Sequence, residues 1–323
     1  MTVLVTGGAG YLGSELVDEL LDAGHDVRVL DVLLHGDNGL ARRLDARGAE
    51  LLRGDVRDPA ARRRALAGVQ AVVHLAAIVG DPACGRDPGL SDAVNVDGTR
   101  ALVLDARNAG VERFVFASTC SNYGRMADAS VPIDETGELR PVSLYAEQKV
   151  AMERALLNGG ANGLAATCLR FATLYGVGHR MRFDLTVNEF TRDLWAGRTL
   201  EVFGELFWRP YVHVRDAARA IALVLDTPLD KVAGRVFNAG HSDENYRKAD
   251  LVELITARLD AGDVKYVTRS EDPRDYKVSF ERIKSELGFE PARRVSDGID
   301  ELVGALEERR FGDPFSPRYS NIG

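Results

Sequence analysis

Residues 3–13 of the chain read V-L-V-T-G-G-A-G-Y-L-G. The apolar, β-branched start indicates a strand, and Tyr11 opens a stretch in which leucines recur at helical spacing. Between strand and helix lie Gly7, Gly10 and Gly13. In such a unit the first glycine permits a tight turn, the second lets the backbone approach a pyrophosphate, and the third allows close packing of helix on strand. Because N–H groups at a helix start attract phosphate oxygens, this stretch predicts a dinucleotide site.

An acidic residue at the end of the next expected strand strengthens this prediction. Asp31 follows Gly13 by 18 positions, where a carboxylate can accept both hydroxyl groups of the adenosine ribose. The same carboxylate would repel the additional 2′-phosphate of NADP. We therefore expect NAD as the cofactor. The alternative for Asp31 is a capping or loop role.

Short apolar runs alternate with helical patterns through the first two-thirds of the chain. This alternation predicts right-handed βαβ units on a parallel sheet that helices cover on both faces. Strands are expected at residues 2–6, 27–31, 50–53, 71–75, 113–118 and 166–171, with helices at 11–23, 91–109 and 143–157.

After about residue 176 the pattern loosens, and arginine and aromatic residues become frequent. Further helices are expected at residues 214–225, 248–261 and 295–310. We interpret residues 1–176 as a dinucleotide-binding domain and residues 177–323 as a smaller, interleaved lobe.

Composition excludes several classes of protein. Forty-one basic against 49 acidic residues give a net charge of −8, which argues against a general nucleic-acid binder. Cys84, Cys120 and Cys168 are widely spaced, so they suggest neither a disulfide framework nor a zinc site. The chain shows no signal-peptide pattern and no apolar run long enough to cross a bilayer. We expect a cytoplasmic protein that binds no metal.

A Y-x-x-x-K pair supplies candidate chemistry. Tyr145 and Lys149 fall on one face of an expected helix. A lysine ammonium stabilises a phenolate and so lowers the pKa of the tyrosine towards working pH. Thr119, at the end of an expected strand, can supply a hydroxyl group that orients a substrate.

Taken together, these features resemble the extended short-chain dehydrogenase/reductases, in particular the nucleotide-sugar epimerase/dehydratase branch. The likeness covers almost the whole chain. Its further segments are G-D-V at 54–56, H-L-A-A at 74–77, N-V-D-G-T at 95–99, R-F-A-T-L-Y-G at 170–176 and R-P-Y-V-H-V-R-D at 209–216.

The resemblance implies a fold and a set of roles. The fold is a Rossmann-type doubly wound sheet with a smaller C-terminal substrate-binding lobe. Tyr145 would be the acid/base, Lys149 its partner and a ribose ligand, and Thr119 a ligand of the substrate hydroxyl. Cofactor contacts are implied for Gly7, Gly10, Tyr11, Leu12, Gly13, Asp31, Asp55, Val56, Leu75, Ala76, Ala77, Asn95, Tyr145, Lys149 and Phe171, and substrate contacts for Thr119, Thr173, Asn188, Arg209 and Arg274.

The two arginines suit a diphosphate, because a guanidinium fork matches two oxygens at once. The alternative for Arg209 and for Arg274 is a surface ion pair. The family pattern has asparagine at the position of Thr173, where its amide contacts the substrate phosphate. Asn188, nearby in the sequence, is a candidate to replace that contact. We therefore expect a nucleoside-diphosphate sugar as the small-molecule partner.

A second departure narrows the chemistry. The 4,6-dehydratases of the family carry Asp-Glu directly after the threonine, whereas this chain has Cys120 and Ser121. Neither is a strong general acid at neutral pH. Some epimerase-reductases pair a cysteine with a histidine near the position of His179; a Cys120–His179 pair is a further alternative, beside a core cysteine and a loop histidine.

We therefore expect a nucleotide-sugar epimerase that inverts C4 through a transient 4-keto sugar. A 4-ketoreductase is the nearest alternative, followed by a 4,6-dehydratase or a decarboxylase; a catalytically silent NAD-sensing module is the alternative from another class. By resemblance alone we expect a homodimer, built on the helices at 91–109 and 143–157. The identity of the nucleotide and of the sugar stays open.

Overall fold

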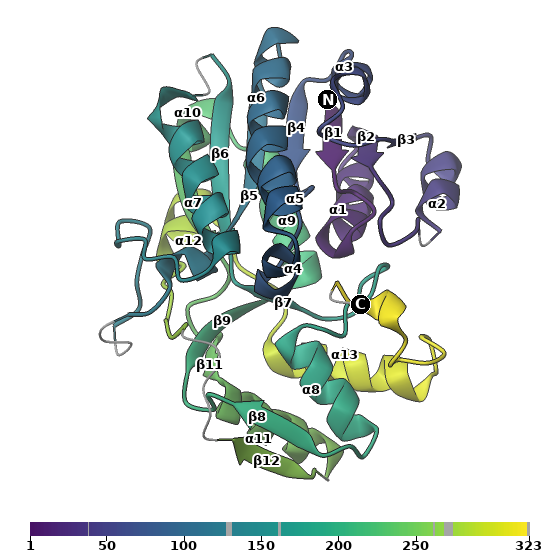
Figure 1. Cartoon of the computed structure of the whole chain (residues 1–323), viewed down its shortest axis with the longest axis vertical. Helices are drawn as coiled ribbons and strands as arrows, with labels where there is room; N and C mark the ends of the chain where they lie inside the picture. The colour runs from purple at the N-terminus through teal and green to yellow at the C-terminus, as the bar shows by residue number, and fades with distance from the viewer. Residues whose placement is uncertain (38, 127–130, 161–162, 261, 268–273, 322–323) are drawn as a thin grey trace. The chain divides into compact units, whose positions relative to one another are not determined.

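The computed structural model describes residues 1–37, 39–126, 131–160, 163–260, 262–267 and 274–321, and the chain forms two compact units (Figure 1). Unit 1 comprises residues 1–119, 143–170 and 218–237, and unit 2 comprises 120–142, 171–217 and 238–323. This division differs from the expected boundary at residue 176. Each unit consists of three segments of the chain. Residues 218–237 belong to unit 1 with the early segments, and residues 120–142 belong to unit 2 with the later ones.

Unit 1 is built on a seven-stranded sheet with the strand order β10-β6-β5-β4-β1-β2-β3. The pairs β1/β2, β1/β4, β2/β3 and β4/β5 are parallel. The order reverses between β1 and β4, the point at which doubly wound sheets bind dinucleotides. This confirms the expected fold class. The bounds are β1 Thr2–Thr6, β2 Asp26–Asp31, β3 Glu50–Arg53, β4 Ala71–His74, β5 Arg113–Thr119, β6 Ala165–Phe171 and β10 Arg235–Ala239.

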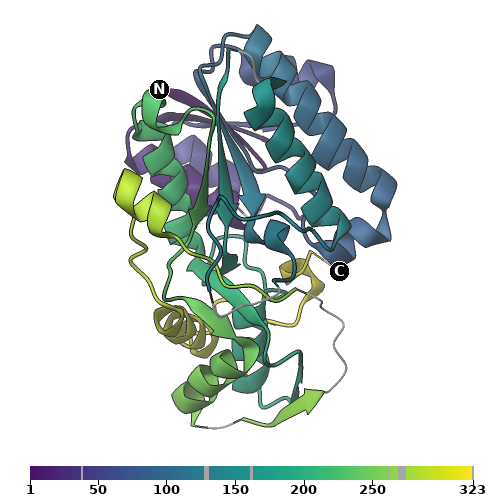
Figure 2. The ribbon, with the colours of Figure 1, turned by 90° about the vertical axis from the view of Figure 1, so that its left-hand side faces the viewer.

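Helices cover both faces of this sheet. Figure 2 shows α6 and α7 on one face, with α1 and α9 on the other. Apolar side chains of β4, β5, α6 and α7 meet in one buried cluster that includes Val72, Phe114, Leu102 and Met152. The bounds are α1 Tyr11–Asp22, α2 Leu40–Ala46, α3 Pro59–Leu66, α4 Asp81–Arg86, α5 Pro88–Asp92, α6 Thr99–Asn108, α7 Leu144–Ala155, α9 Val214–Asp226 and α10 Leu229–Val232.

The expected single helix at 91–109 is interrupted. A π-helical segment, Ala93–Gly98, separates α5 from α6. Within it the Asn95 side chain donates to the carbonyl oxygen of Ile78 at 3.0 Å and accepts from the Ile78 N–H at 2.8 Å. The wide turn therefore holds the loop that follows β4. A second π-helical segment, Leu156–Gly160, follows α7.

Unit 2 contains a three-stranded sheet, β11-β9-β7, and a parallel pair, β8 and β12. Its core gathers Tyr175, Phe183, Tyr211, Ile255 and Leu302. The bounds are β7 Thr173–Tyr175, β8 Leu200–Phe203, β9 Trp208–His213, β11 Asn245–Arg247, β12 Val264–Val267, α8 Thr186–Trp195, α11 Lys248–Leu259, α12 Glu281–Leu287 and α13 Val295–Glu307. No helix in the described ranges of the chain is long and apolar enough to cross a bilayer.

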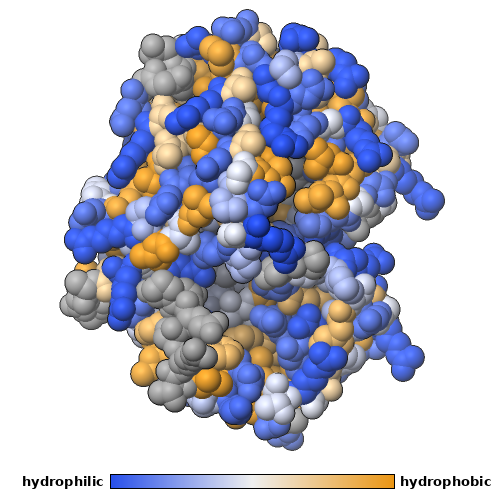
Figure 3. Space-filling model, viewed as in Figure 1, coloured by the Kyte–Doolittle hydropathy of each residue, from blue (hydrophilic) through white to orange (hydrophobic). Residues whose placement is uncertain are grey.

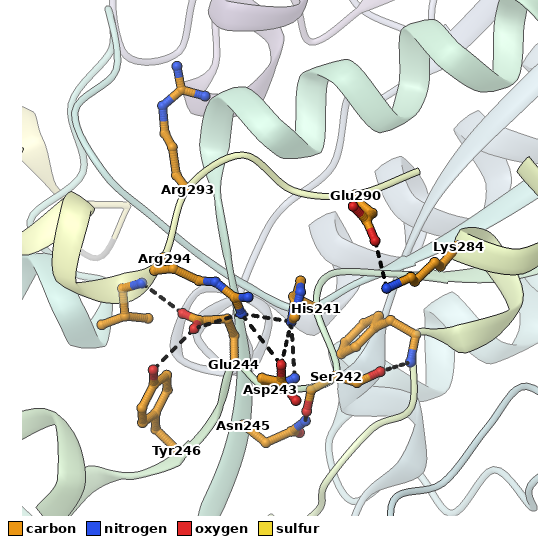
Figure 4. A network of polar contacts seen from close by, with 12 residues as sticks. His241, Ser242, Asp243, Glu244, Asn245, Tyr246, Lys284, Glu290, Arg293 and Arg294 are labelled. Carbon is orange, nitrogen blue, oxygen red and sulfur yellow. Dashed lines mark hydrogen bonds and ion pairs between the residues drawn. The ribbon is translucent and has the colours of Figure 1, made fainter. Parts of the chain in front are cut away.

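A polar network joins the loop before β11 to the start of α13 (Figure 4). Glu244, 3% exposed, accepts hydrogen bonds from the N–H of Val295 at 2.7 Å and from the hydroxyl of Tyr246 at 3.1 Å. Burial and the Glu244 carboxylate raise the pKa of Tyr246 to about 12. Arg294 also contacts Glu244, at 3.3 Å, and lies 2.9 Å from Nδ1 of His241. These bonds fix the first turn of α13 to the sheet of unit 2.

Candidate active site

The glycine loop between β1 and α1 has no room for larger side chains. Gly7 has φ +75°, and a Cβ atom there would lie 2.7 Å from the N atom of Ala76. A Cβ atom at Gly13 would lie 2.3 Å from the carbonyl oxygen of Gly7. Gly10 donates to the same oxygen at 3.1 Å and begins α1. The loop therefore has the close packing that brings backbone N–H groups to a phosphate.

Asp31 ties the end of β2 to this loop. Its Oδ2 atom accepts from the N–H of Ala9 at 3.0 Å, and its Oδ1 atom accepts from the N–H of Leu33 at 2.7 Å. The side chain is half-buried. A carboxylate has about four acceptor positions, so bonds to backbone N–H groups do not by themselves prevent it from accepting ribose hydroxyl groups. The loop role and the ribose role of Asp31 are therefore compatible.

The other implied cofactor residues of unit 1 follow the carboxyl ends of neighbouring strands. Asp55 and Val56 follow β3, and Arg57 bonds Asp55 at 2.6 Å, which lowers the pKa of that carboxyl group. The half-buried residues Leu75, Ala76 and Ala77 follow β4, while Tyr11 is buried and Leu12 half-buried in α1. Phe171 ends β6 and belongs to unit 2.

Asn95 has a side-chain amide that is bonded at both ends. It is 4% exposed, and its amide nitrogen donates to Oε1 of Gln148 at 2.8 Å as well as to Ile78. With both ends of the amide bonded inside unit 1, Asn95 shapes the loop after β4. We propose this indirect contribution in place of a direct cofactor contact.

Thr119, Tyr145 and Lys149 all belong to unit 1, where α7 packs on β5. The Nζ atom of Lys149 lies 5.7 Å from the centre of the Tyr145 ring and 4.7 Å from that of Phe116. Lys149 is 5% exposed, and burial lowers its pKa to about 8. Thr119 and Tyr145 are half-buried, so both can be reached by a ligand.

A buried polar cluster on β5, β6 and α7 was not predicted from the sequence. Ser118, Glu153 and Arg170 are each at most 4% exposed, and Glu153 bonds both Ser118 and Arg170. One signal was present: Glu153 continues the four-residue spacing of Tyr145 and Lys149 along one face of α7. Acidic residues are seldom buried without a partner, so that position predicts a cation on a neighbouring element.

In unit 2, two of the implied substrate residues gather around a tyrosine. The guanidinium of Arg209, a residue 5% exposed, lies 5.0 Å from the ring centre of Tyr276. The Tyr276 hydroxyl is 3.4 Å from that of Ser121. Burial raises the pKa of Tyr276, while the charges of Arg209 and Arg274 oppose that rise. The sequence analysis did not single out Tyr276.

The remaining candidates of unit 2 are Asn188 and Thr173, which pairs with Tyr211 on the strand that also carries Arg209. Thr173 begins β7 and is half-buried. Asn188, in α8, is fully buried; its Oδ1 accepts from the N–H of Gly176 at 2.9 Å and its Nδ2 donates to the carbonyl of Arg182 at 2.8 Å. Its amide therefore holds a loop of unit 2, and a substrate contact of Asn188 stays a prediction. Asp272 and Pro273, before Arg274, lie outside the described residues.

The alternative acid–base pair is not favoured by the environments of its two members. Cys120 is 1% exposed and lies among buried groups near Tyr276. His179 is exposed. A cysteine buried to this extent packs as a small apolar side chain.

Sequence comparison identifies the family. Residues 3–240 match the model of the NAD dependent epimerase/dehydratase family. The chain belongs to this family. Its cofactor is NAD, and the protein is an enzyme of the extended short-chain dehydrogenase/reductase type. The glycine loop and Asp31 fit that cofactor on geometry alone.

Relatives in this family carry two activities. The chain is 34% identical to a dTDP-glucose 4,6-dehydratase of Streptomyces griseus, over 98% of this chain and 97% of that protein. It is also 34% identical to a UDP-glucose 4-epimerase of Corynebacterium glutamicum, over 96% and 98%. Family membership therefore leaves the choice between epimerase and dehydratase to individual residues.

Solved structures of the family likewise include both epimerases and dehydratases. A UDP-glucose 4-epimerase of Thermus thermophilus in complex with NAD matches with a TM-score of 0.83 and 29% identity, over 95% of this chain and 99% of that one. A dTDP-glucose 4,6-dehydratase of Streptomyces venezuelae with NAD bound matches with a TM-score of 0.86 and 30% identity, over 98% and 100%.

Proposed function

We propose that the protein is an NAD-dependent nucleotide-sugar epimerase that inverts C4 through a transient 4-keto sugar. One observation carries the proposal: Thr119, Tyr145 and Lys149 share unit 1 with the glycine loop, and the positions after Thr119 hold Cys120 and Ser121. The trio provides proton transfer at a sugar hydroxyl. The two following residues lack the acid that expulsion of water requires.

The chain's own residues have distinct tasks in this reaction. Bound NAD supplies a reversible hydride acceptor. Tyr145 removes the proton from the C4 hydroxyl and later returns one to the same oxygen. Thr119 hydrogen-bonds that hydroxyl and orients it. Lys149, whose buried ammonium lies near the phenol, favours the phenolate and binds the nicotinamide ribose.

The substrate is a nucleoside-diphosphate sugar. Support comes from the relatives, whose printed names specify UDP- and dTDP-linked glucose, and from Arg209 and Arg274 near Tyr276. Guanidinium groups match the paired oxygens of a diphosphate. Within unit 2, Thr173 is a further predicted substrate ligand.

A 4,6-dehydratase is the second candidate, because dehydratases stand beside epimerases among the relatives. Its chemistry requires a group that protonates the leaving hydroxyl at C6. Cys120 is almost fully buried, and Ser121 lies against Tyr276. Neither replaces a carboxylic acid at neutral pH. The 4-ketoreductase is a weaker candidate, since net reduction draws more naturally on NADPH.

Mass analysis of products separates these activities. The protein is incubated with NAD and a panel of UDP- and dTDP-sugars, and each product is weighed and its stereochemistry assigned. An unchanged mass with inverted C4 is expected. Loss of water would assign a dehydratase, gain of two hydrogens with NADPH a reductase, and loss of carbon dioxide a decarboxylase. No conversion of any sugar would leave the NAD-sensing alternative.

We also propose that two copies associate through α6 and α7. The surface between these helices has a hollow of about 200 Å³, lined by side chains that include Leu104, Arg107 and Met152. Leu104 is 48% exposed. Apolar and hydrophilic side chains intermix over α6 and α7 on the face that Figure 3 shows. Solution scattering should give a dimeric mass, and Leu104→Glu should reduce it to that of a monomer; a monomeric mass for the unmodified chain would contradict this.

A cytoplasmic location belongs to the same proposal. Cys84, Cys120 and Cys168 are all buried as free thiols, as is usual in a reducing compartment. Cell fractionation, with a known cytoplasmic enzyme as the reference, tests it.

A further inference from the structure

A buried carboxylate joins α7 to two strands of unit 1. Glu153, 1% exposed, accepts a hydrogen bond from Oγ of Ser118 at 2.7 Å and another from Nε of Arg170 at 2.8 Å. Nη2 of Arg170 also bonds the carboxylate. Ser118 lies on β5 and Arg170 on β6, so the three residues connect three elements.

This cluster lies directly next to the proposed catalytic residues along the chain. Ser118 precedes Thr119 in β5, and Glu153 lies one helical turn after Lys149 in α7. Lys149 in turn donates to the carbonyl oxygen of Ala117 at 2.7 Å. Two successive turns of α7 therefore bond two successive residues of β5.

We propose that Glu153 is a positioning residue that fixes the register of α7 on β5 and so places Tyr145 against Thr119. A shift of α7 by one residue would move Tyr145 by about 1.5 Å along the helix axis. Misplacement by about 1 Å can lower turnover about 100-fold. Neither Glu153 nor Arg170 needs to touch the substrate for this role. The expected effect of Glu153 on turnover rests on the proposed function.

The variants must distinguish a change in the register of α7 on β5 from a loss of overall stability of the fold. Ser118→Ala removes one bond to Glu153 and leaves the ion pair. The double variant Glu153→Gln, Arg170→Gln removes both charges together, because a single change would leave one buried charge uncompensated. The matched control is Asp105→Asn, which removes the charge of the half-buried Asp105 from its ion pair with Arg62, 2.6 Å long, in the same unit; Arg62 keeps its hydrogen bond to the carbonyl oxygen of Val56.

Two kinds of measurement apply to the whole chain with NAD present. Hydrogen–deuterium exchange of residues 144–155 reports the attachment of α7. Steady-state kinetics over pH report kcat, KM and the pH at which kcat is half-maximal.

We expect exchange in α7 to rise about fivefold in Ser118→Ala, the effect of one lost hydrogen bond. We expect kcat to fall about 10-fold or more, with KM within about twofold of the unmodified value. The half-maximal pH should stay unchanged, because Tyr145 and Lys149 move together on α7 and keep their separation. Asp105→Asn should change none of these.

The outcomes are distinguishable. Equal exchange in α7 for folded Ser118→Ala and the unmodified chain would overturn the proposal, and so would a kcat that falls only with the folded fraction. If the double variant does not fold, Ser118→Ala decides. If the unmodified chain converts no sugar, the proposed function fails, and hydrogen–deuterium exchange alone tests the positioning role. Faster exchange confined to α7 in Ser118→Ala supports that role. Uniformly faster exchange, or unchanged exchange, overturns it.

Discussion

The Nζ atom of Lys149 donates a hydrogen bond to the main-chain oxygen of Ala117 across 2.7 Å, two residues before Thr119. The bond holds an ammonium inside the protein at the end of β5. Burial lowers the pKa of Lys149 to about 8, from 10.5. The charge on which the proposed chemistry depends is therefore lost slightly above neutral pH.

The first prediction concerns this charge. NAD affinity of the unmodified chain should fall as the pH rises above about 8, because the neutral amine binds the ribose less well. Lys149→Met should bind NAD more weakly at pH 7 and should lack that pH dependence. Calorimetric titration between pH 6.5 and 9.5 measures both. Lys284→Met, which removes an exposed lysine paired with Glu290, is the control and should behave as the unmodified chain. A pH-independent affinity of the unmodified chain would contradict the prediction.

The second prediction concerns the choice between NAD and NADP. Asp31→Ala should bring the two affinities closer together, because a 2′-phosphate beside a carboxylate suffers like-charge repulsion. The substitution also removes two backbone bonds, to Ala9 and Leu33, so NAD binding itself should weaken. Asp22→Ala, at an exposed ion pair with Arg47, is the control. Equal affinity of the unmodified chain for NAD and NADP would overturn the assignment.

The third prediction concerns stability in acid. His74 is buried between the hydroxyl groups of Thr6, at 2.7 Å, and Thr99, at 2.8 Å. Burial, with a smaller effect of the Lys149 charge, lowers its pKa to about 3, from 6.5. Between these values the unfolded chain binds the extra proton, so stability rises with pH and is lost as the pH falls from 6.5 towards 3.

This group should remove about 2 kcal/mol of the unfolding free energy between pH 7 and pH 5. His74→Gln should lose that dependence, although it is less stable at pH 7. Urea unfolding at the two pH values measures the difference. An exposed histidine, His179, provides the control: His179→Gln should retain the full loss.

Much of unit 1 could be predicted from the sequence, because its signals are local. Alternating apolar strands and helices fix a parallel sheet, and Gly7, Gly13 and Asp31 lie where their spacing implies. The π-helical segment at Ala93–Gly98 could not be predicted, since it depends on bonds between Asn95 and the distant Ile78. A smaller, interleaved lobe was expected, but the segments that belong to each unit could not be located, because the pairing of late segments with early ones leaves no local pattern.

The site shows the same contrast. Tyr145 and Lys149 follow from one helical repeat, whereas the bonding of Glu153 to Ser118 and Arg170 depends on three elements that meet only in the fold. Asn188 shows the converse: its residue type suited a phosphate, yet its amide is bonded to Gly176 and Arg182. Residue type predicts what a side chain can bind, and burial decides whether a ligand reaches it.

The fourth prediction concerns the acid/base. Tyr145→Phe removes the phenol but keeps the ring beside Lys149, so kcat should fall about 10²–10⁴-fold while NAD affinity changes little. Tyr266→Phe, at an exposed tyrosine, is the control. Retention of more than roughly a tenth of the rate would move the role to another residue, and Cys120→Ala and His179→Gln would be measured next.

The fifth prediction separates epimerase from reductase through the fate of the hydride. In an epimerase the sugar is oxidised and reduced again on the same protein, so the nicotinamide returns to its starting state in each cycle. Substoichiometric NAD should then support many turnovers without accumulation of NADH. A sugar nucleotide deuterated at C4 should keep its label in the product, because the hydride does not exchange with water.

Asp31, placed to accept the ribose hydroxyl groups and to repel a 2′-phosphate, motivates this expectation, as does the absence of an acid at Cys120 and Ser121. Absorbance at 340 nm and mass spectrometry of the product measure the two quantities. Label found on free NADH, or a requirement for stoichiometric NADPH, would assign the 4-ketoreductase instead; label carried from C4 to C6 with loss of water would assign the dehydratase.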